Sequence, residues 1–182
     1  MDEMILFYDK KVNDLFYENN QRIFQHLASL SCEKILETDI KELAEEIYQD
    51  HKLKDLSLDT DQMKVLSYDS SFMKVGIPVR EGKELMGFRP TNEYGSVHPV
   101  GALEDDWVTK VFSFHDNMDR VKKNVRIWKD VMDLYSNNLD EDIIHYHKHL
   151  LKDIEDMIRN LRNRCTDLEG RIKSLSTELN MK

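Results

Sequence analysis

The chain has 182 residues, of which 34% are charged, carries a net charge of −9, and contains only six glycines and three prolines. This length suffices for one sizeable core with an extended appendage, and the composition suits a helix-rich chain. The acidic balance argues against a general nucleic-acid or anionic-membrane binder, although local basic patches stay open.

The sequence shows neither a recognisable signal peptide nor a cysteine spacing typical of a metal site or a disulfide. Residues 4–8 form an apolar run that is too short for a signal peptide and is flanked by acids. Cys32 and Cys165 lie far apart and fit neither a metal-ligand nor a disulfide spacing. We therefore expect a cytoplasmic protein with no membrane partner.

The N-terminal part is predicted to contain two helices, at residues 9–30 and 39–51. In both segments apolar residues recur at steps of three and four, or of seven, which is typical of one buried helix face. Ser31 is expected to cap a short turn between them. Asp39 and Glu42 form a variant of the capping box at the start of the second helix.

Strands are expected within residues 62–114, where the apolar pattern changes to alternation. Its clearest example has Val75, Ile77 and Val79 on one side of a strand. Residues 85–88 are predicted to form a further short strand, and 107–114 the last one. The Gly- and Pro-containing segment between them, residues 90–103, is predicted to be a long loop.

The C-terminal part is predicted to be an antiparallel helical hairpin of unequal arms. The first arm covers residues 117–135 after an N-cap at Asp116, and Ser136 to Asn138 form a polar connection. Asn138 is the expected N-cap of the second arm. The predicted fold class is α+β, with an α+β body at residues 1–135 and a long helix at 136–182 that packs on the body and projects from it.

The long helix carries a heptad pattern typical of a coiled coil. One position is occupied by Ile144, Leu151, Ile158, Cys165, Ile172 and Leu179, and the position three residues later by His147, Ile154, Leu161, Leu168 and Leu175. The predicted interface comprises Ile154, Ile158, Leu161, Cys165, Leu168, Ile172, Leu175 and Leu179. His147 is expected to be a polar core residue that sets the register.

Three histidines in this helix raise the question of a metal site. Glu141, His145 and His149 share one helix face, and zinc needs three or four converging ligands. Because the three residues span two turns, they converge poorly on a single ion. A solvated polar face is the preferred interpretation, and the metal site is kept as an alternative.

Asp69, Glu81 and Lys83 match the loose D…E-x-K spacing of metal-dependent nucleases, in which two carboxylates hold Mg²⁺. That motif requires a central strand, whereas Pro78 and Gly82 indicate a turn. We expect no catalytic residues and keep the nuclease as an alternative function.

Basic residues on the predicted helices form a second candidate surface. They are Lys122, Arg126, Lys129, Arg159 and Arg162. A stripe of this kind could bind phosphates, but it also matches the solvated flanks of a coiled coil, which we prefer. The sequence contains no phosphate-loop, nucleophile-elbow, zincin or C-x-x-C motif, so no cofactor is predicted.

Residues 53–164 resemble the non-catalytic N-terminal region of multidomain bacterial proteins, some of them in anti-phage loci. The similarity lies in Val75-Gly76-Ile77-Pro78-Val79-Arg80-Glu81-Gly82, Glu84-Leu85, Arg89-Pro90, Asn138-Leu139 and residues 159–164, with Val79 where an aromatic residue is more usual. In those proteins an effector such as a Toll/interleukin-receptor-like or nuclease domain follows. The resemblance implies a sensor or scaffold module and no catalytic residues.

Together these patterns favour a non-enzymatic interaction, oligomerisation or sensor module, and the resemblance implies a bacterial, antiviral-defence context. The expected partner is a second copy of the chain or another helical protein. The alternative partner is a nucleic acid.

Overall fold

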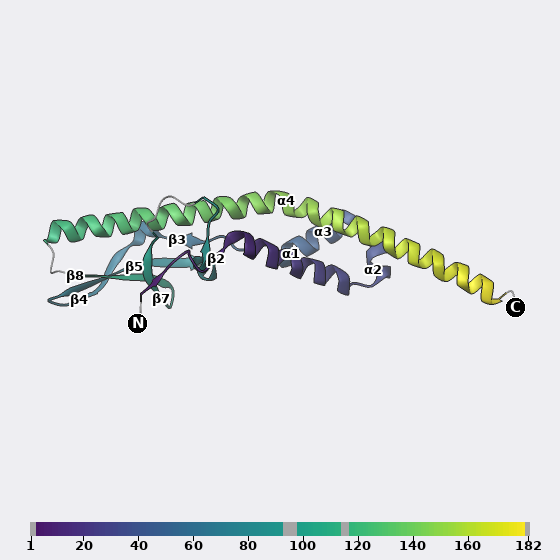
Figure 1. Cartoon of the computed structure of the whole chain (residues 1–182), viewed down its shortest axis with the longest axis horizontal. Helices are drawn as coiled ribbons and strands as arrows, with labels where there is room; N and C mark the ends of the chain where they lie inside the picture. The colour runs from purple at the N-terminus through teal and green to yellow at the C-terminus, as the bar shows by residue number, and fades with distance from the viewer. Residues whose placement is uncertain (1–2, 93–97, 114–116, 181–182) are drawn as a thin grey trace. The chain divides into compact units, whose positions relative to one another are not determined.

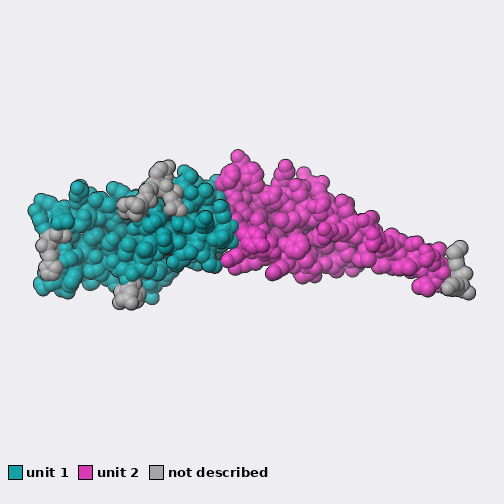
Figure 2. Space-filling view, in the orientation of Figure 1, with its two compact units in different colours: residues 1–15, 53–144 teal, residues 16–52, 145–182 magenta. Residues whose placement is uncertain are grey.

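The computed structural model describes residues 3–92, 98–113 and 117–180, and it confirms the α+β class (Figure 1). The chain groups into two compact units (Figure 2). Unit 1 comprises residues 1–15 and 53–144, and unit 2 comprises residues 16–52 and 145–182. Among the described helices, none is both long and apolar enough to cross a membrane.

Unit 1 is built on an antiparallel sheet. Its strands follow the order β1 (Met4–Ile5), β7 (Val100–Glu104), β8 (Trp107–Ser113), β5 (Phe72–Glu81) and β3 (Ser57–Leu58), and β4 (Lys64–Tyr68) pairs with the other half of β5. A separate parallel pair joins β2 (Lys10–Lys11) to β6 (Phe88–Arg89). The short 3₁₀ helix η1 (Thr60–Gln62) lies between β3 and β4.

Side chains along β5 alternate between the two faces of the sheet. Val75, Ile77 and Val79 are buried, as predicted from the sequence. Gly76 points to the other face, where an added Cβ would lie 2.6 Å from Leu66 Cδ1 and 2.9 Å from Trp107 Cε3. The strand therefore carries bulk on the core side and accepts close neighbours on the other.

Two predictions between β5 and β8 are wrong. Residues 85–88 do not form a strand of their own: Gly82 turns the chain with φ 70°, and the 3₁₀ helix η2 (Lys83–Gly87) follows. The predicted loop at 90–103 contains most of β7. In this strand, a Cβ added at Gly101 would lie only 2.8 Å from the Thr109 carbonyl oxygen. A glycine was thus needed for strand packing and not for a loop.

The predicted hairpin is wrong, because a single helix, α4 (Met118–Asn180), runs through residues 136–138. Tyr135, Leu139 and Ile143 continue one buried stripe at helical steps, so the apolar face passes the polar triplet without a break. Asn138 is therefore not an N-cap. Its side-chain nitrogen donates instead to the Asn92 carbonyl at 3.1 Å. The N-cap expected at Asp116 lies outside the described residues.

In unit 1 the sheet packs against the first part of α4. The Phe112 and Trp128 rings meet edge to face at 6.0 Å, and the Phe7 and Tyr135 rings lie 5.6 Å apart. Met132 is fully buried on the same helix face. Aromatic contacts of this kind contribute beyond their buried area.

Unit 2 consists of three helices that pack on the second part of α4: α1 (Val12–Ser29), whose first residues belong to unit 1, α2 (Cys32–Glu37) and α3 (Ile40–His51). Their shared core is Ile23, Leu27, Leu43, Ala44, Ile47, Leu150, Ile154 and Ile158. The cap at Ser31 is confirmed by a 3.2 Å hydrogen bond from Lys34 N, and Asp39 accepts from the Lys41 and Glu42 amides. The backbone hydrogen bond from Glu42, followed by that from Lys41, lowers the pKa of Asp39.

Arg162, expected on a solvated flank, joins α4 to the end of α2. Its Nε donates to the Ile35 carbonyl at 3.0 Å, and a terminal nitrogen donates to the Thr38 carbonyl. These carbonyls belong to the last turn of a helix, where acceptors lack intrahelical partners and a cation is favourable.

Cys32 and Cys165 form a disulfide, so the expectation of unpaired cysteines is wrong. The two Cα atoms lie 5.5 Å apart although the cysteines are 133 residues apart in sequence. This pairing depends on the packing of α2 on α4, which no spacing rule contains.

We expect Arg162→Met to lower the free energy of unfolding by about 1.5–3 kcal/mol, because the variant keeps the aliphatic stem and leaves two carbonyls without their charged donor. Urea titration followed by circular dichroism measures the change. Arg164→Met is the matched control, since Arg164 is exposed. Equal effects at the two positions would show that the carbonyl contacts carry no stability.

We expect Cys165→Ser to lower the free energy of unfolding by about 2–5 kcal/mol relative to the oxidised protein, because the disulfide closes a long loop. Melting with and without a reductant gives the measurement, and the variant should not respond to the reductant. Alkylation of both cysteines in native protein purified without reductant would contradict the disulfide.

Asp140 supplies a pH-dependent contribution within unit 1. Burial raises the pKa of this carboxyl to about 6, although a 3.0 Å hydrogen bond from Leu56 N opposes the shift. Because the folded pKa exceeds the unfolded one, the native state binds the proton more tightly. This group's contribution to stability is therefore present at low pH and is lost as pH rises through about 6.

Asp140→Asn should therefore raise the free energy of unfolding at pH 7.5 by about 1 kcal/mol, a value reduced for partial exposure, and change it little near pH 4. The amide oxygen still accepts from Leu56. Unfolding titrations at both pH values test this, with the exposed Glu141→Gln as the control for lost charge. A pH-independent gain would assign the effect to something other than ionisation.

Candidate functional site

The predicted interface on α4 divides at Cys165. Ile154 and Ile158 are fully buried, Leu161 packs against the same core, and Cys165 is 6% exposed. These four residues face the helices of unit 2 and are not available to another molecule.

The remaining four predicted interface residues are exposed. We call Leu168, Ile172, Leu175 and Leu179 the C-terminal seam; their exposed fractions are 51%, 53%, 57% and 74%. Within unit 2, Figure 1 shows α4 continuing past α2 with no other labelled element beside it. The helix therefore presents a row of large apolar side chains to solvent, at heptad spacing.

Charged residues flank the seam. On one flank, directly before the first heptad core position, lie Arg164, Arg171 and Glu178. On the other flank, directly after the second core position, lies Glu169. Glu169 also lies 3.9 Å from Lys173 on its own helix, a contact so exposed that it adds little stability. Glu169 thus remains available to a partner.

The heptad register predicted for the start of the long helix is wrong. Ile144 is 63% exposed, whereas its neighbour Ile143 is fully buried. His147 is partly buried, with its ring edge-on to Tyr48 at a centroid distance of 6.0 Å. The buried stripe thus takes a different set of positions before Leu150.

The alternative metal site is not formed. The His145 and His149 rings meet edge to face at 5.1 Å, but nowhere in the described parts of the chain do three or more potential ligands gather around one point. Glu141, His145 and His149 therefore lack the convergence that zinc requires.

The alternative nuclease residues are also separated. Asp69 sits in the turn before β5, where its carboxylate accepts from the Ser71 and Phe72 amides, at 2.7 and 2.8 Å. Glu81 ends the same strand, so about nine strand steps, or about 30 Å, lie between the two carboxylates. Lys83 donates to the Asp105 carbonyl. No shared Mg²⁺ site can arise from this arrangement.

Several of the basic residues proposed to contact phosphates have acidic neighbours, although the exposed pairs among them are weak. Lys129 lies 3.0 Å from Asp133 and 3.6 Å from Asp61. Arg159 lies 3.1 Å from Glu155, and Lys122 lies 3.8 Å from Asp119. Arg162 is engaged at α2, and Lys122, Lys129 and Arg159 each have an acidic neighbour, so Arg126 is the exposed candidate for which no such neighbour is seen among the described residues. The candidate residues therefore carry little uncompensated positive charge.

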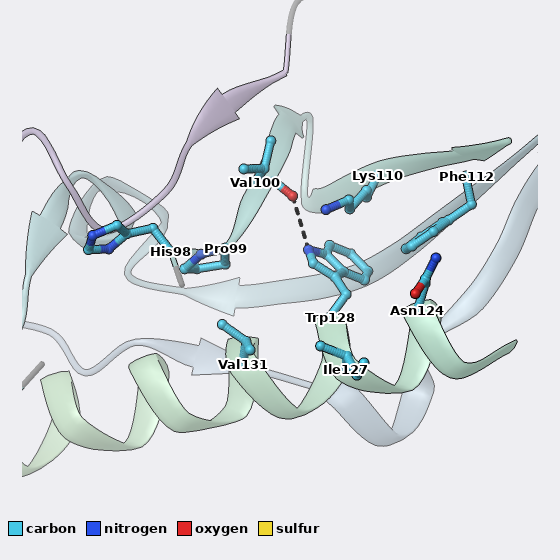
Figure 3. Close-up of a pocket in the computed structure, with 9 residues that line it drawn as sticks. All are labelled: His98, Pro99, Val100, Lys110, Phe112, Asn124, Ile127, Trp128 and Val131. Atoms are coloured by element: carbon cyan, nitrogen blue, oxygen red, sulfur yellow. Dashed lines mark hydrogen bonds between the residues drawn. The ribbon is translucent and has the colours of Figure 1, made fainter. Parts of the chain in front are cut away.

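A cavity lies in unit 1 between the sheet and α4 (Figure 3). Its volume is about 250 Å³, and its lining consists of His98, Pro99, Val100, Lys110, Phe112, Asn124, Ile127, Trp128 and Val131. The Trp128 indole nitrogen donates to the Val100 carbonyl at 3.0 Å, which fixes the ring as one wall. The lining is mainly apolar with a few polar groups, as in small-molecule sites.

The residues of the cavity were missed by sequence reasoning, although one signal was present. Lys110 alternates with Val108 and Phe112 on the inward side of the predicted last strand. A lysine at such a position is unusual and marks a place where charge enters an apolar layer.

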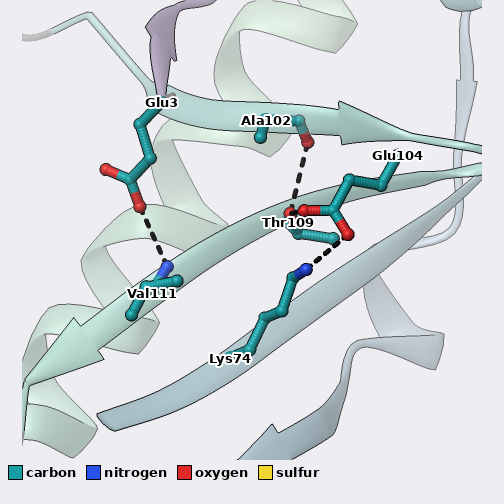
Figure 4. A network of polar contacts seen from close by, with 6 residues as sticks. All are labelled: Glu3, Lys74, Ala102, Glu104, Thr109 and Val111. Carbon is teal, nitrogen blue, oxygen red and sulfur yellow. Dashed lines mark hydrogen bonds and ion pairs between the residues drawn. The ribbon is translucent and has the colours of Figure 1, made fainter. Parts of the chain in front are cut away.

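A polar network elsewhere on the sheet is satisfied internally (Figure 4). Glu104 pairs with Lys74 and accepts from the Thr109 hydroxyl at 3.0 Å. The hydrogen bond from Lys74 lowers the pKa of Glu104. These groups stabilise strand pairing and leave no reactive group for chemistry.

Comparison with known proteins adds no assignment. No family model matches the chain. No curated protein and no solved structure matches it either.

Proposed function

We propose that the chain is a non-enzymatic interaction module that dimerises through the C-terminal seam of α4. The observation that carries this proposal is the contrast along one helix. The stripe that includes Ile143, Ile154 and Cys165 is buried, and the four residues of the C-terminal seam that follow are more than half exposed. Large apolar side chains in a contiguous row mark interaction surfaces in proteins.

A second copy in parallel orientation is the partner that the seam fits. Ile172 and Leu179 occupy one core position, and Leu168 and Leu175 occupy the other. Isoleucine at the first position with leucine at the second favours parallel two-stranded coiled coils. In that arrangement Arg164 of one copy faces Glu169 of the other, five residues further on. Symmetry repeats the pair, so the flanking charges are complementary.

The expected dimer is weak. Full burial of each seam residue would contribute roughly 1.5–3 kcal/mol, and these side chains are already partly covered by their own helix. Association costs about 4–15 kcal/mol in lost motional freedom. We expect a micromolar to millimolar equilibrium that responds to local concentration, as befits a module that assembles when copies are brought together.

The resemblance to bacterial multidomain proteins supplies the context of this proposal. In that setting the chain would act as a sensor or scaffold, and dimerisation would bring attached effector domains together. Neither the nuclease nor the nucleic-acid alternative gains a supporting observation from the geometry.

We expect the mass of the intact chain, measured by sedimentation equilibrium, to rise towards that of a dimer between micromolar and millimolar concentrations. Leu175→Lys should keep it monomeric, because the lysine places a charge in the seam. Ser174→Lys adds the same charge beside the seam and should not. Both positions are exposed, so neither change should unfold unit 2.

The orientation is tested by charge exchange. Glu169→Arg should weaken the dimer, and adding Arg164→Glu in the same chain should restore it only if the helices are parallel. A monomeric mass at all concentrations would refute the proposal.

A further inference from the structure

The cavity in unit 1 has a structural origin in the sheet. β7 pairs with β8 only from Ala102 opposite Thr109 to Glu104 opposite Trp107, while Val100 and Gly101 pair with β1. Beyond Thr109 the two strands separate. Glu3 accepts a 2.9 Å hydrogen bond from Val111 N on this part of β8. The space left on the side of α4 is the cavity.

Lys110 is the charged residue of this space. It faces the same side of β8 as Phe112, and its ammonium lies 5.7 Å from the Phe112 ring centroid. Burial lowers the pKa of Lys110, and the attraction of Glu3 opposes that shift. Among the described residues, none accepts a hydrogen bond from this ammonium at the cavity.

The opposite walls are aromatic and aliphatic. The Trp128 indole is held by the hydrogen bond from its nitrogen to Val100 and by its edge-to-face contact with the Phe112 ring. Ile127 and Val131 extend the apolar wall along α4 (Figure 3). His98 also lines the cavity, and its Nδ1 shares a 3.0 Å hydrogen bond with the Tyr135 hydroxyl, which fixes the ring.

We propose that this cavity binds a small aromatic carboxylate, with its ring against Trp128 and Phe112 and its carboxylate at Lys110. A cavity of about 150 Å³ accommodates benzene in another protein, so about 250 Å³ has room for one ring and a short acidic substituent. An organic cation would be repelled by Lys110. A phosphate would find one ammonium where such groups usually meet several donors.

Phenylacetate is a suitable probe, compared with 2-phenylethanol and 2-phenylethylamine as neutral and cationic analogues. We expect titration calorimetry on the full chain to rank their affinities in that order. In nuclear magnetic resonance spectra, the indole N–H signal of Trp128 should shift on binding and so locate the ligand. A Trp107→Phe variant distinguishes this signal from that of Trp107.

Lys110→Met should weaken phenylacetate binding about tenfold and leave 2-phenylethanol nearly unchanged, since it removes the charge but keeps the stem. Val131→Phe should fill the cavity and weaken both. Lys123→Met, which removes an exposed lysine from α4, is the matched control and should bind as the unaltered chain does.

Three results would overturn the proposal. The first is no phenylacetate binding at millimolar concentration, and the second is equal affinity for the acid and the alcohol. The third is binding that leaves the Trp128 signal unmoved. None of these depends on self-association, because the cavity and the C-terminal seam belong to different units.

Discussion

The structure depends on the burial of a single apolar stripe along α4. Val121, Met132, Ile143, Ile154 and Cys165 are all buried and follow one another at intervals of eleven residues. Eleven residues make three turns at 3.67 residues per turn, close to the 3.6 of an α-helix, so residues at this spacing share nearly one face of the helix. The sheet of unit 1 and the short helices of unit 2 each cover a different stretch of it.

The strength of the local sequence signal decides which parts of the fold could be predicted. Elements with strong local signals, such as the capped helix starts at Ser31 and Asp39 and the alternation of β5, were predicted close to their observed positions. The break at residues 136–138 was predicted from polarity alone, whereas the eleven-residue spacing from Met132 to Ile143 already indicated continuity. A seven-residue repeat extended back to Ile144 predicted that this residue is buried, because the heptad pattern was followed instead of the eleven-residue one.

The candidate sites differ in how far sequence could reach them. The C-terminal seam was predictable because an amphipathic pattern is local, but its division at Cys165 depends on which helices pack on α4. The separation of Asp69 from Glu81 follows once both ends of β5 are known. The cavity depends on where β7 leaves β8 and on a tryptophan from a distant helix, which are tertiary facts.

Gly170 gives the end of α4 a thermodynamic character of its own. A Cβ at this position would meet nothing within 4 Å, so the glycine relieves no crowding. It lowers helix propensity by about 1 kcal/mol relative to alanine, in a segment whose length is marginal for an isolated helix. The last turns therefore gain their order mainly by propagation from the packed part of the helix. Pairing of two such segments would couple association to the helix–coil equilibrium of the segment. Part of the favourable contact free energy would then offset the entropy lost when the backbone becomes ordered.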